Sequence, residues 1–196
     1  MSSFKREFNC APQNSSRIHT EGGYGKVYIG KFSSSEGQCT FGVVKRWINV
    51  DEDPQFQRET VLLSDNKHEN LISLIGFCDE EKKNILVYEY AANQSLHDFH
   101  LEDRTFMWIQ RLKVCLGAAC GLEYLHNPRG AQRVLHCDIK NANILLDENW
   151  TAKIADFGFS KYGPATQNLS YLITQAKGTL GYADPEFLET MNYMKE

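Results

Sequence analysis

H-C-D-I-K-N-A-N, at residues 136–143, is the stretch of this 196-residue sequence that decides its fold, together with D-F-G at residues 156–158. The first stretch places a carboxylate, an ammonium and an amide on one short predicted loop. The second adds a carboxylate after a short apolar strand pattern. Mg²⁺ binds carboxylate and amide oxygens in combination with the oxygens of a bound phosphate. We therefore interpret Asn143 and Asp156 as metal ligands at a nucleotide site, and Asp138 as the acceptor of a hydroxyl proton.

Three features upstream fit the same site, although each has an ordinary alternative. E-G-G-Y-G-K-V (21–27) predicts a turn where Gly22 and Gly25 let backbone N–H groups approach phosphates, but a plain hairpin would also carry these glycines. A strand pattern follows them, which argues against a dinucleotide-binding fold, where a helix must follow. Lys45 ends an apolar strand pattern and is placed to hold phosphates, with Glu59 of the next helix as its partner. An edge lysine and a solvated glutamate are the alternatives.

Composition narrows the class of protein. The length allows one sizeable domain or two small lobes, and 42% hydrophobic residues suffice for a core. The net charge of −4 argues against nucleic acid or an anionic membrane as the main partner. We find no apolar run of membrane-spanning length and no leading signal peptide. None of the six cysteines forms a C-x-x-C pair, so we expect free thiols in a reducing compartment.

Hydrophobic periodicity predicts an antiparallel sheet with one helix in residues 1–90 and a mainly helical region after it. In the first region we expect a hairpin about the glycine-rich turn, a strand over 39–48, a helix starting at Asp53-Pro54, and strands over 71–77 and 84–90. In the second we expect helices over 95–101 and 106–126, a loop over 134–143, short strands over 144–146 and 152–155, and a mobile segment over 156–186.

Taken together, the motifs resemble those of the eukaryotic protein kinase domain, from about residue 16 to the end of the chain. The matching stretches are E-G-G-Y-G-K-V (21–27), V-V-K (43–45), Glu59, H-C-D-I-K-N-A-N (136–143), D-F-G (156–158) and D-P-E (184–186). Other stretches are similar to plant receptor-like serine/threonine kinases, in particular the malectin-domain, FERONIA-like branch. They include L-V-Y-E-Y (86–90), G-L-E-Y-L-H (121–126) and G-T-L-G-Y-A-D-P-E (178–186).

The resemblance implies an α+β, bilobal protein-kinase-like fold. It divides the chain into a tail or linker remnant over 1–15, an N-terminal lobe over 16–91 with a complete antiparallel sheet plus one helix, and a partial C-terminal lobe over 92–196. The family continues beyond D-P-E with several helices, whereas this sequence stops at Glu196, so we expect an incomplete, mainly helical second lobe. The predicted helix over 106–126 would then expose an apolar face.

By position, the resemblance also implies a role for each candidate site residue. Those expected to bind ATP are Gly22, Gly23, Gly25, Val27, Val43, Lys45, Tyr88, Glu89, Ala91, Asn143 and Leu145. Those expected to act in catalysis are Lys45 with Glu59, Asp138 as proton acceptor, and Lys140 beside the transferred phosphate with Thr179 assisting. Asn143 and Asp156 would hold Mg²⁺ or Mn²⁺. Tyr88 and Leu145 also lie in apolar runs, so ordinary core packing is the alternative for both.

These roles imply an ATP-dependent serine/threonine kinase that transfers the γ-phosphate of Mg-ATP to protein hydroxyls. Cys137 replaces the arginine that normally pairs with a phosphorylated activation segment, which makes the kinase non-RD and predicts little dependence on that phosphorylation. The alternative is a catalytically weak or inactive nucleotide-binding or regulatory module that pairs with a full-length receptor kinase. Either is expected on the cytoplasmic side, at the plasma membrane if the domain is part of a longer receptor-like kinase, with no nucleic-acid partner.

Overall fold

The computed structural model describes residues 18–22, 25–33, 39–47, 54–79, 84–99, 106–127, 132–164, 171–173, 178–190 and 192–194. They belong to two compact units, the first formed by Met1–Asp65 with Ile72–Tyr90 and the second by Asn66–Leu71 with Ala91–Glu196. The short segment Asn66–Leu71 thus belongs to the second unit, although sequence of the first unit flanks it on both sides. Among the described residues, no helix is both long enough and apolar enough to cross a membrane.

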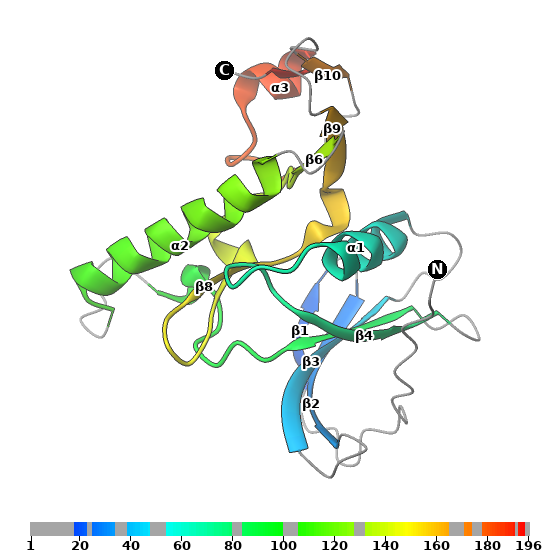
Figure 1. Cartoon of the computed structure of the whole chain (residues 1–196), viewed down its shortest axis with the longest axis vertical. Helices are drawn as coiled ribbons and strands as arrows, with labels where there is room; N and C mark the ends of the chain where they lie inside the picture. The colour runs from blue at the N-terminus through cyan, green and yellow to red at the C-terminus, as the bar shows by residue number, and fades with distance from the viewer. Residues whose placement is uncertain are drawn as a thin grey trace. The chain divides into compact units, whose positions relative to one another are not determined.

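The first unit is built on a five-stranded antiparallel sheet in the order β1-β2-β3-β5-β4 (Figure 1). Its strands are β1 (Ile18–Gly22), β2 (Gly25–Ser33), β3 (Cys39–Trp47), β4 (Leu74–Cys78) and β5 (Ile85–Glu89). Its described residues include one helix, α1 (Pro54–Asp65). The predicted antiparallel sheet with one helix is therefore confirmed, and β3 lies at its centre, between β2 and β5.

Helix α1 buries one face. Pro54 occupies the first helical position, where its missing N–H leaves no hydrogen bond unmade. The buried residues recur every three or four positions, as a helix packed on one side requires. They are Phe56, Glu59, Thr60, Leu62 and Leu63. Each apolar member stabilises the fold by roughly 1.5–3 kcal/mol on leaving water, whereas burial of the Glu59 carboxylate is unfavourable unless a cation accompanies it.

The second unit contains a long helix, α2 (Trp108–His126), and three pairs of short antiparallel strands (Figure 1). The pairs are β6 (Gln132–Leu135) with β9 (Lys161–Pro164), β7 (Ile144–Leu146) with β8 (Ala152–Ile154), and β10 (Tyr171–Ile173) with β11 (Asn192–Met194). Shorter elements are the 3₁₀ helices η1 (Leu96–Asp98), η2 (Asn141–Asn143) and η3 (Phe157–Phe159), and the helix α3 (Pro185–Thr190). The predicted long helix and the strand pair β7–β8 are confirmed.

The core of the second unit joins α2 to β7 and β8. Its buried apolar members are Phe106, Val114, Ile144, Leu146 and Ala152. Segment Asn66–Leu71 lies close to α2 at Gly121, where an added Cβ would come 2.9 Å from the Asn70 carbonyl oxygen. Asn70 also donates from Nδ2 to the Ala152 carbonyl oxygen at 3.0 Å, and its own carbonyl accepts from the Ile154 N–H at 2.9 Å. Segment Asn66–Leu71 is therefore fixed against both α2 and β8.

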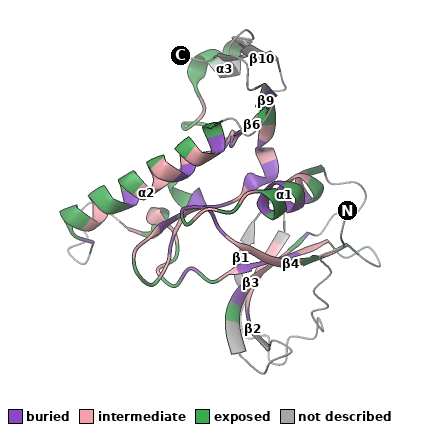
Figure 2. Cartoon of the chain, in the orientation of Figure 1, coloured by how far each residue is buried: buried purple, intermediate pink, exposed green. Residues whose placement is uncertain are grey.

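Several apolar residues at and near the start of α2 are exposed, and Figure 2 shows the exposed positions of this helix in green. The exposed residues are Met107, just before the helix, and Trp108, Ile109, Leu112 and Leu116 within it, with 59, 72, 53, 46 and 66% of their surface accessible. Helical residues four positions apart lie on the same side, so Trp108, Leu112 and Leu116 form one stripe. The apolar exposed face predicted for this helix is present.

Four predictions of local structure differ from the structure, because in each segment a strand or bridge pairs with residues far away in the sequence. The loop predicted over 134–143 begins inside β6, and the segment predicted to be mobile over 156–186 contains β9, because these two strands pair with each other. The strand predicted from residue 71 begins only at Leu74, because Leu71 forms a bridge with Ile154. The helix predicted over 95–101 is limited to η1, and Ser95 instead forms a bridge with Leu145.

Candidate active site

Lys45 and Glu59 form an ion pair inside the first unit. The Lys45 Nζ lies 3.0 Å from the Glu59 Oε2, and the two side chains are 17% and 1% exposed. Because β3 is a central strand, Lys45 is not the solvated edge lysine of the ordinary alternative, and Glu59 is not a solvated helix residue. Removing one partner from a pair at this depth would leave the other charge buried without compensation.

The remaining strand residues of the predicted nucleotide site lie on β2, β3 and β5. Val27 is opposite Lys45 in the β2–β3 pair, and Val43 is opposite Tyr88 in the β3–β5 pair. Tyr88 is 6% exposed, in agreement with the core role that its apolar run indicates. The neighbouring Glu89 accepts a hydrogen bond at Oε1 from the Ser73 N–H at 2.8 Å. Strand pairing in the first unit thus brings Val27 next to Lys45 and Val43 next to Tyr88.

The glycine-rich turn is described in part. Gly22 and Gly25 are opposite each other at the end of the β1–β2 hairpin, whereas Gly23 lies outside the described residues. Two further candidates belong to the second unit, where Ala91 is 9% exposed and Leu145 is half-buried on β7.

Three side chains converge on the carboxylate of Asp138, which is only 4% exposed. Thr179 donates its hydroxyl to Oδ1 at 2.7 Å. Lys140 Nζ lies 2.8 Å from Oδ2, and Asn143 Nδ2 donates to the same oxygen at 3.1 Å. Lys140 also donates to the Thr179 hydroxyl oxygen at 2.8 Å. A carboxylate held in this way has a fixed orientation, as an acceptor of a hydroxyl proton requires.

His136 attaches this loop to the chain that follows β8. Burial lowers the pKa of His136 and outweighs the hydrogen bond to the Ala155 carbonyl oxygen and the charges of Asp156 and Asp138, which raise it. Its Nδ1 accepts from the Asp138 N–H at 3.3 Å, so Nε2 carries the proton and donates to the Ala155 carbonyl oxygen at 3.0 Å. Ser160, fully buried, donates its hydroxyl to the His136 carbonyl oxygen at 3.1 Å. The motif contains this histidine, but its pattern does not reveal that the ring acts as a structural support.

The two predicted metal ligands lie on adjacent backbone segments. The Ala155 N–H, one residue before Asp156, donates to the Asn143 carbonyl oxygen at 2.9 Å. The side-chain Nδ2 of Asn143 donates to the backbone carbonyl oxygen of Asp138 at 2.9 Å and to the Asp138 carboxylate. The Asn143 amide oxygen therefore remains for a cation. Among the described residues, no three acidic, histidine or cysteine side chains form a metal-binding group. Two oxygen ligands suit a Mg²⁺ ion that also binds phosphate oxygens.

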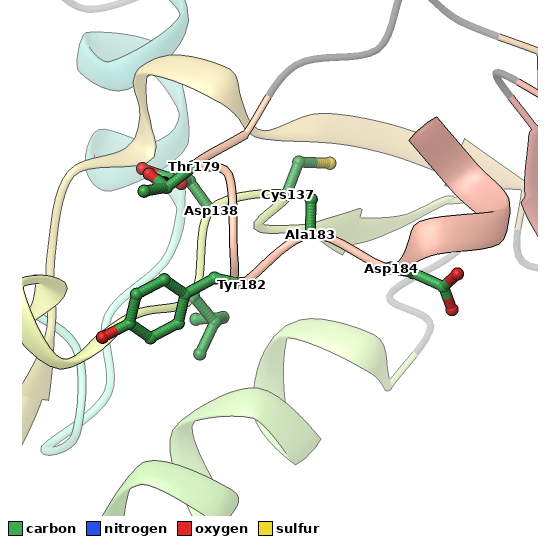
Figure 3. A pocket seen from close by; sticks show the side chains of 7 residues that line it. Cys137, Asp138, Thr179, Tyr182, Ala183 and Asp184 are labelled. Atoms are coloured by element: carbon green, nitrogen blue, oxygen red, sulfur yellow. Dashed lines mark hydrogen bonds between the residues drawn. The ribbon is translucent and has the colours of Figure 1, made fainter. Parts of the chain in front are cut away.

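A cavity of about 190 Å³ opens beside the Asp138 carboxylate (Figure 3). It is lined by Cys137, Asp138, Ile139, Thr179, Tyr182, Ala183 and Asp184. Cys137 has a left-handed backbone, with φ of 66°, and its Sγ lies 3.4 Å from the Leu135 carbonyl oxygen. The candidate proton acceptor Asp138 therefore lines a cavity large enough for a substrate side chain. Tyr182, Ala183 and Asp184 form part of the wall of this cavity.

Comparison with known proteins gives matches over nearly the whole chain. The chain is 43% identical to the receptor-like protein kinase FERONIA of Arabidopsis thaliana over 188 residues, which cover 92% of this chain and 20% of that protein. It is 45% identical to the receptor-like protein kinase THESEUS 1 of the same plant over 170 residues, covering 85% of this chain and 19% of that protein. The chain thus spans about a fifth of the length of the curated relatives that it matches.

The model of the protein kinase domain matches residues 16–196. This match and the two relatives confirm the resemblance that the motifs predict, and they confirm the fold class, an antiparallel sheet unit followed by a unit with helices. The kinase activity predicted for the family is likewise that of the matched domain and of the named relatives. On these grounds the chain belongs to the protein kinase domain family.

Proposed function

We propose that this chain transfers the γ-phosphate of Mg-ATP to serine or threonine hydroxyls of protein substrates. The observation that carries the proposal is the carboxylate of Asp138, which lies beside a cavity and is oriented by Lys140, Thr179 and Asn143. The Lys45–Glu59 ion pair supports it, because a lysine fixed by a buried carboxylate is suited to bind phosphate oxygens.

In the proposed reaction, Asp138 accepts the proton of the substrate hydroxyl at Oδ1, the oxygen that Thr179 also contacts. Lys140 offsets the carboxylate charge from 2.8 Å and would also contact the group being transferred. Lys45 and the backbone of the glycine-rich turn would bind the phosphates, and Asn143 and Asp156 would hold the metal ion. When bound, ATP would supply the phosphoryl group and leave as ADP, and Mg²⁺ or Mn²⁺ would neutralise the phosphate oxygens. Positioning and charge neutralisation supply most of the rate in such a site.

Cys137 supports a non-RD mode of control. A thiol bonded to the Leu135 carbonyl oxygen cannot form the bidentate ion pair by which an arginine binds a phosphorylated residue. We expect the rate of substrate phosphorylation to change less than about tenfold, or 1.4 kcal/mol, when the activation segment is phosphorylated. The measurement compares phosphatase-treated and phosphorylated chain with one peptide substrate, and a larger gain in rate would contradict this mode of control.

The test of the proposed function is phosphorylation of a generic protein by the purified chain with Mg-ATP. Asp138→Asn and Asp156→Ala should each abolish incorporation of phosphate. Glu148→Gln removes an acidic charge from the exposed β7–β8 turn and serves as the matched control with unchanged activity. Failure of the wild-type chain to transfer phosphate, or full activity of Asp138→Asn, would overturn the proposal.

A second candidate is a nucleotide-binding or regulatory module without turnover that pairs with a full-length receptor kinase. The exposed apolar face of α2 favours this candidate, because an apolar stripe of this kind is typical of a surface that a partner covers. A rise in melting temperature with Mg-ATP, in the absence of any phosphate transfer, would select it. Since its relatives are named receptor-like kinases, we propose that the domain lies on the cytoplasmic side in either case, at the plasma membrane if it is part of a longer receptor-like kinase.

A further inference from the structure

We propose that Trp47 is a positioning residue for Lys45, holding its ammonium group over the indole ring in the orientation that binds phosphate. The proposal rests on the function assigned to Lys45 above and extends it to a residue outside every motif of the sequence. It concerns the first unit alone, and it is built from β3, which carries both residues, and from α1.

The side chains of Lys45 and Trp47 lie on the same face of β3, because residues two apart in a strand point to the same side. The Lys45 Nζ lies 4.5 Å from the centroid of the Trp47 ring. This is within the distance of about 6 Å at which a cation is attracted to an aromatic face, and tryptophan has the most favourable face. Trp47 is 2% exposed, so the attraction acts in surroundings that exclude most of the water.

Trp47 also connects β3 to α1. Its ring lies 5.6 Å from that of Phe56, centroid to centroid, at an interplanar angle of 75°, an edge-on contact. Phe56 and Glu59 are one helical turn apart, so they lie on the same side of α1. β3 therefore meets α1 at two points, the Trp47–Phe56 contact and the Lys45–Glu59 ion pair at 3.0 Å. A shift of α1 that separates the aromatic rings would also separate the ion pair.

Core packing alone does not require an indole at this position. The Trp47 Nε1 is buried and has no hydrogen-bond partner among the residues that the structure describes, which is unfavourable for folding. A phenylalanine would fill apolar space here without burying that N–H group. What the indole provides, in addition to volume, is a broad face for the Lys45 ammonium, and this distinguishes positioning from packing.

Two substitutions separate these roles in the full chain. Trp47→Leu keeps an apolar side chain but removes the aromatic face, and Trp47→Phe keeps a smaller face. We expect Trp47→Leu to raise the KM for ATP by about 2- to 30-fold, the range that corresponds to a cation–π contact. Trp47→Phe should restore most of the affinity, and the KM for the protein substrate should not change in either variant. A purely structural role would instead lower the folded fraction, and with it the apparent kcat, at constant KM for ATP.

A second measurement does not depend on nucleotide or turnover. In the NMR spectrum of the wild-type chain, the ε-methylene protons of Lys45 should be shifted upfield by the ring current of Trp47, with Lys45→Arg used for assignment. The shift should disappear in Trp47→Leu and persist in part in Trp47→Phe. If the wild-type chain transfers no phosphate, the proposed function fails while this spectrum still decides the Lys45–Trp47 contact. An unshifted wild-type resonance, or equal KM values for ATP in wild type and both folded variants, would overturn the inference.

Discussion

Replacement of Thr179 by valine should destabilise the second unit, because it removes a hydroxyl from the Asp138 carboxylate without changing the size of the side chain. In the structure, the hydroxyl donates to Oδ1 at 2.7 Å and accepts from Lys140 at 2.8 Å. The substitution removes both hydrogen bonds of the hydroxyl, but Lys140 and Asn143 keep their contacts with Oδ2, so the loss that we count is the charged hydrogen bond to Oδ1. A hydrogen bond to a charged group contributes about 1.5–3 kcal/mol, and for a chain of this length that lowers Tm by roughly 3–12 °C.

The assay is equilibrium unfolding in urea, with Thr179→Ser as the matched control, since serine keeps the hydroxyl and loses only a methyl group. Equal m values would show that the change lies in stability rather than in the unfolded state. At temperatures where both variants are folded, Thr179→Val should also phosphorylate substrate more slowly than Thr179→Ser, because Oδ1 has lost the group that orients it. A valine variant as stable and as active as the wild type, or a serine variant that loses as much as valine, would refute the reasoning.

Three further expectations concern the same unit. Gly121→Val should lower the free energy of unfolding by roughly 1–3 kcal/mol, because the added Cβ would lie 2.9 Å from the Asn70 carbonyl oxygen. The control Ala119→Val changes an exposed site on the same helix and should lower it by less than about 0.7 kcal/mol. Denaturant unfolding measures both values. The pKa values of His136 and His126 are lowered in the folded state, both chiefly by burial, so the unfolded state binds more protons below about pH 6.5. Stability should therefore be fully present above that pH and fall as the pH decreases, and replacing both histidines with asparagine should flatten the dependence; a dependence unchanged in the double variant would exclude this origin. Asn143→Ala removes the amide oxygen proposed for the metal, so a titration should show a higher Mg²⁺ concentration at half-maximal phosphorylation, and an unchanged value would remove this residue from the metal site.

Much of the fold is predictable because its signals are local. The sheet of the first unit arises from apolar runs separated by turns, and α1 begins at the proline that its sequence indicates. The pairing of β6 with β9 has no such local signal, since Val134 and its partner Tyr162 lie on segments that each resemble a loop in isolation. Strands this short gain their stability from the partner strand, and a single segment does not reveal where that partner lies.

The candidate site shows the same division. Asp138, Lys140 and Asn143 are adjacent in sequence, and their order identifies the loop before any geometry is known. The hydroxyl of Thr179 comes from 41 residues further along the chain, and its contact with Asp138 is visible only in the folded unit. Trp47 is missed for a different reason: an aromatic residue at the end of an apolar strand is typical of a core, and nothing in its sequence neighbourhood indicates that a cation lies over its face.

Segment Asn66–Leu71 has a consequence for the order in which the chain can fold during its synthesis. The carbonyl partner of the Asn70 side chain belongs to Ala152, 82 residues further on. At a synthesis rate of about 5–20 residues per second, that partner is made roughly 4–16 seconds after Asn70. All five strands of the first sheet are synthesised well before then. The sheet can therefore form its strand pairs before β8 and α2 are available to contact the segment between α1 and β4. Slow steps late in translation would therefore act on this segment, although it is encoded in the first half of the sequence.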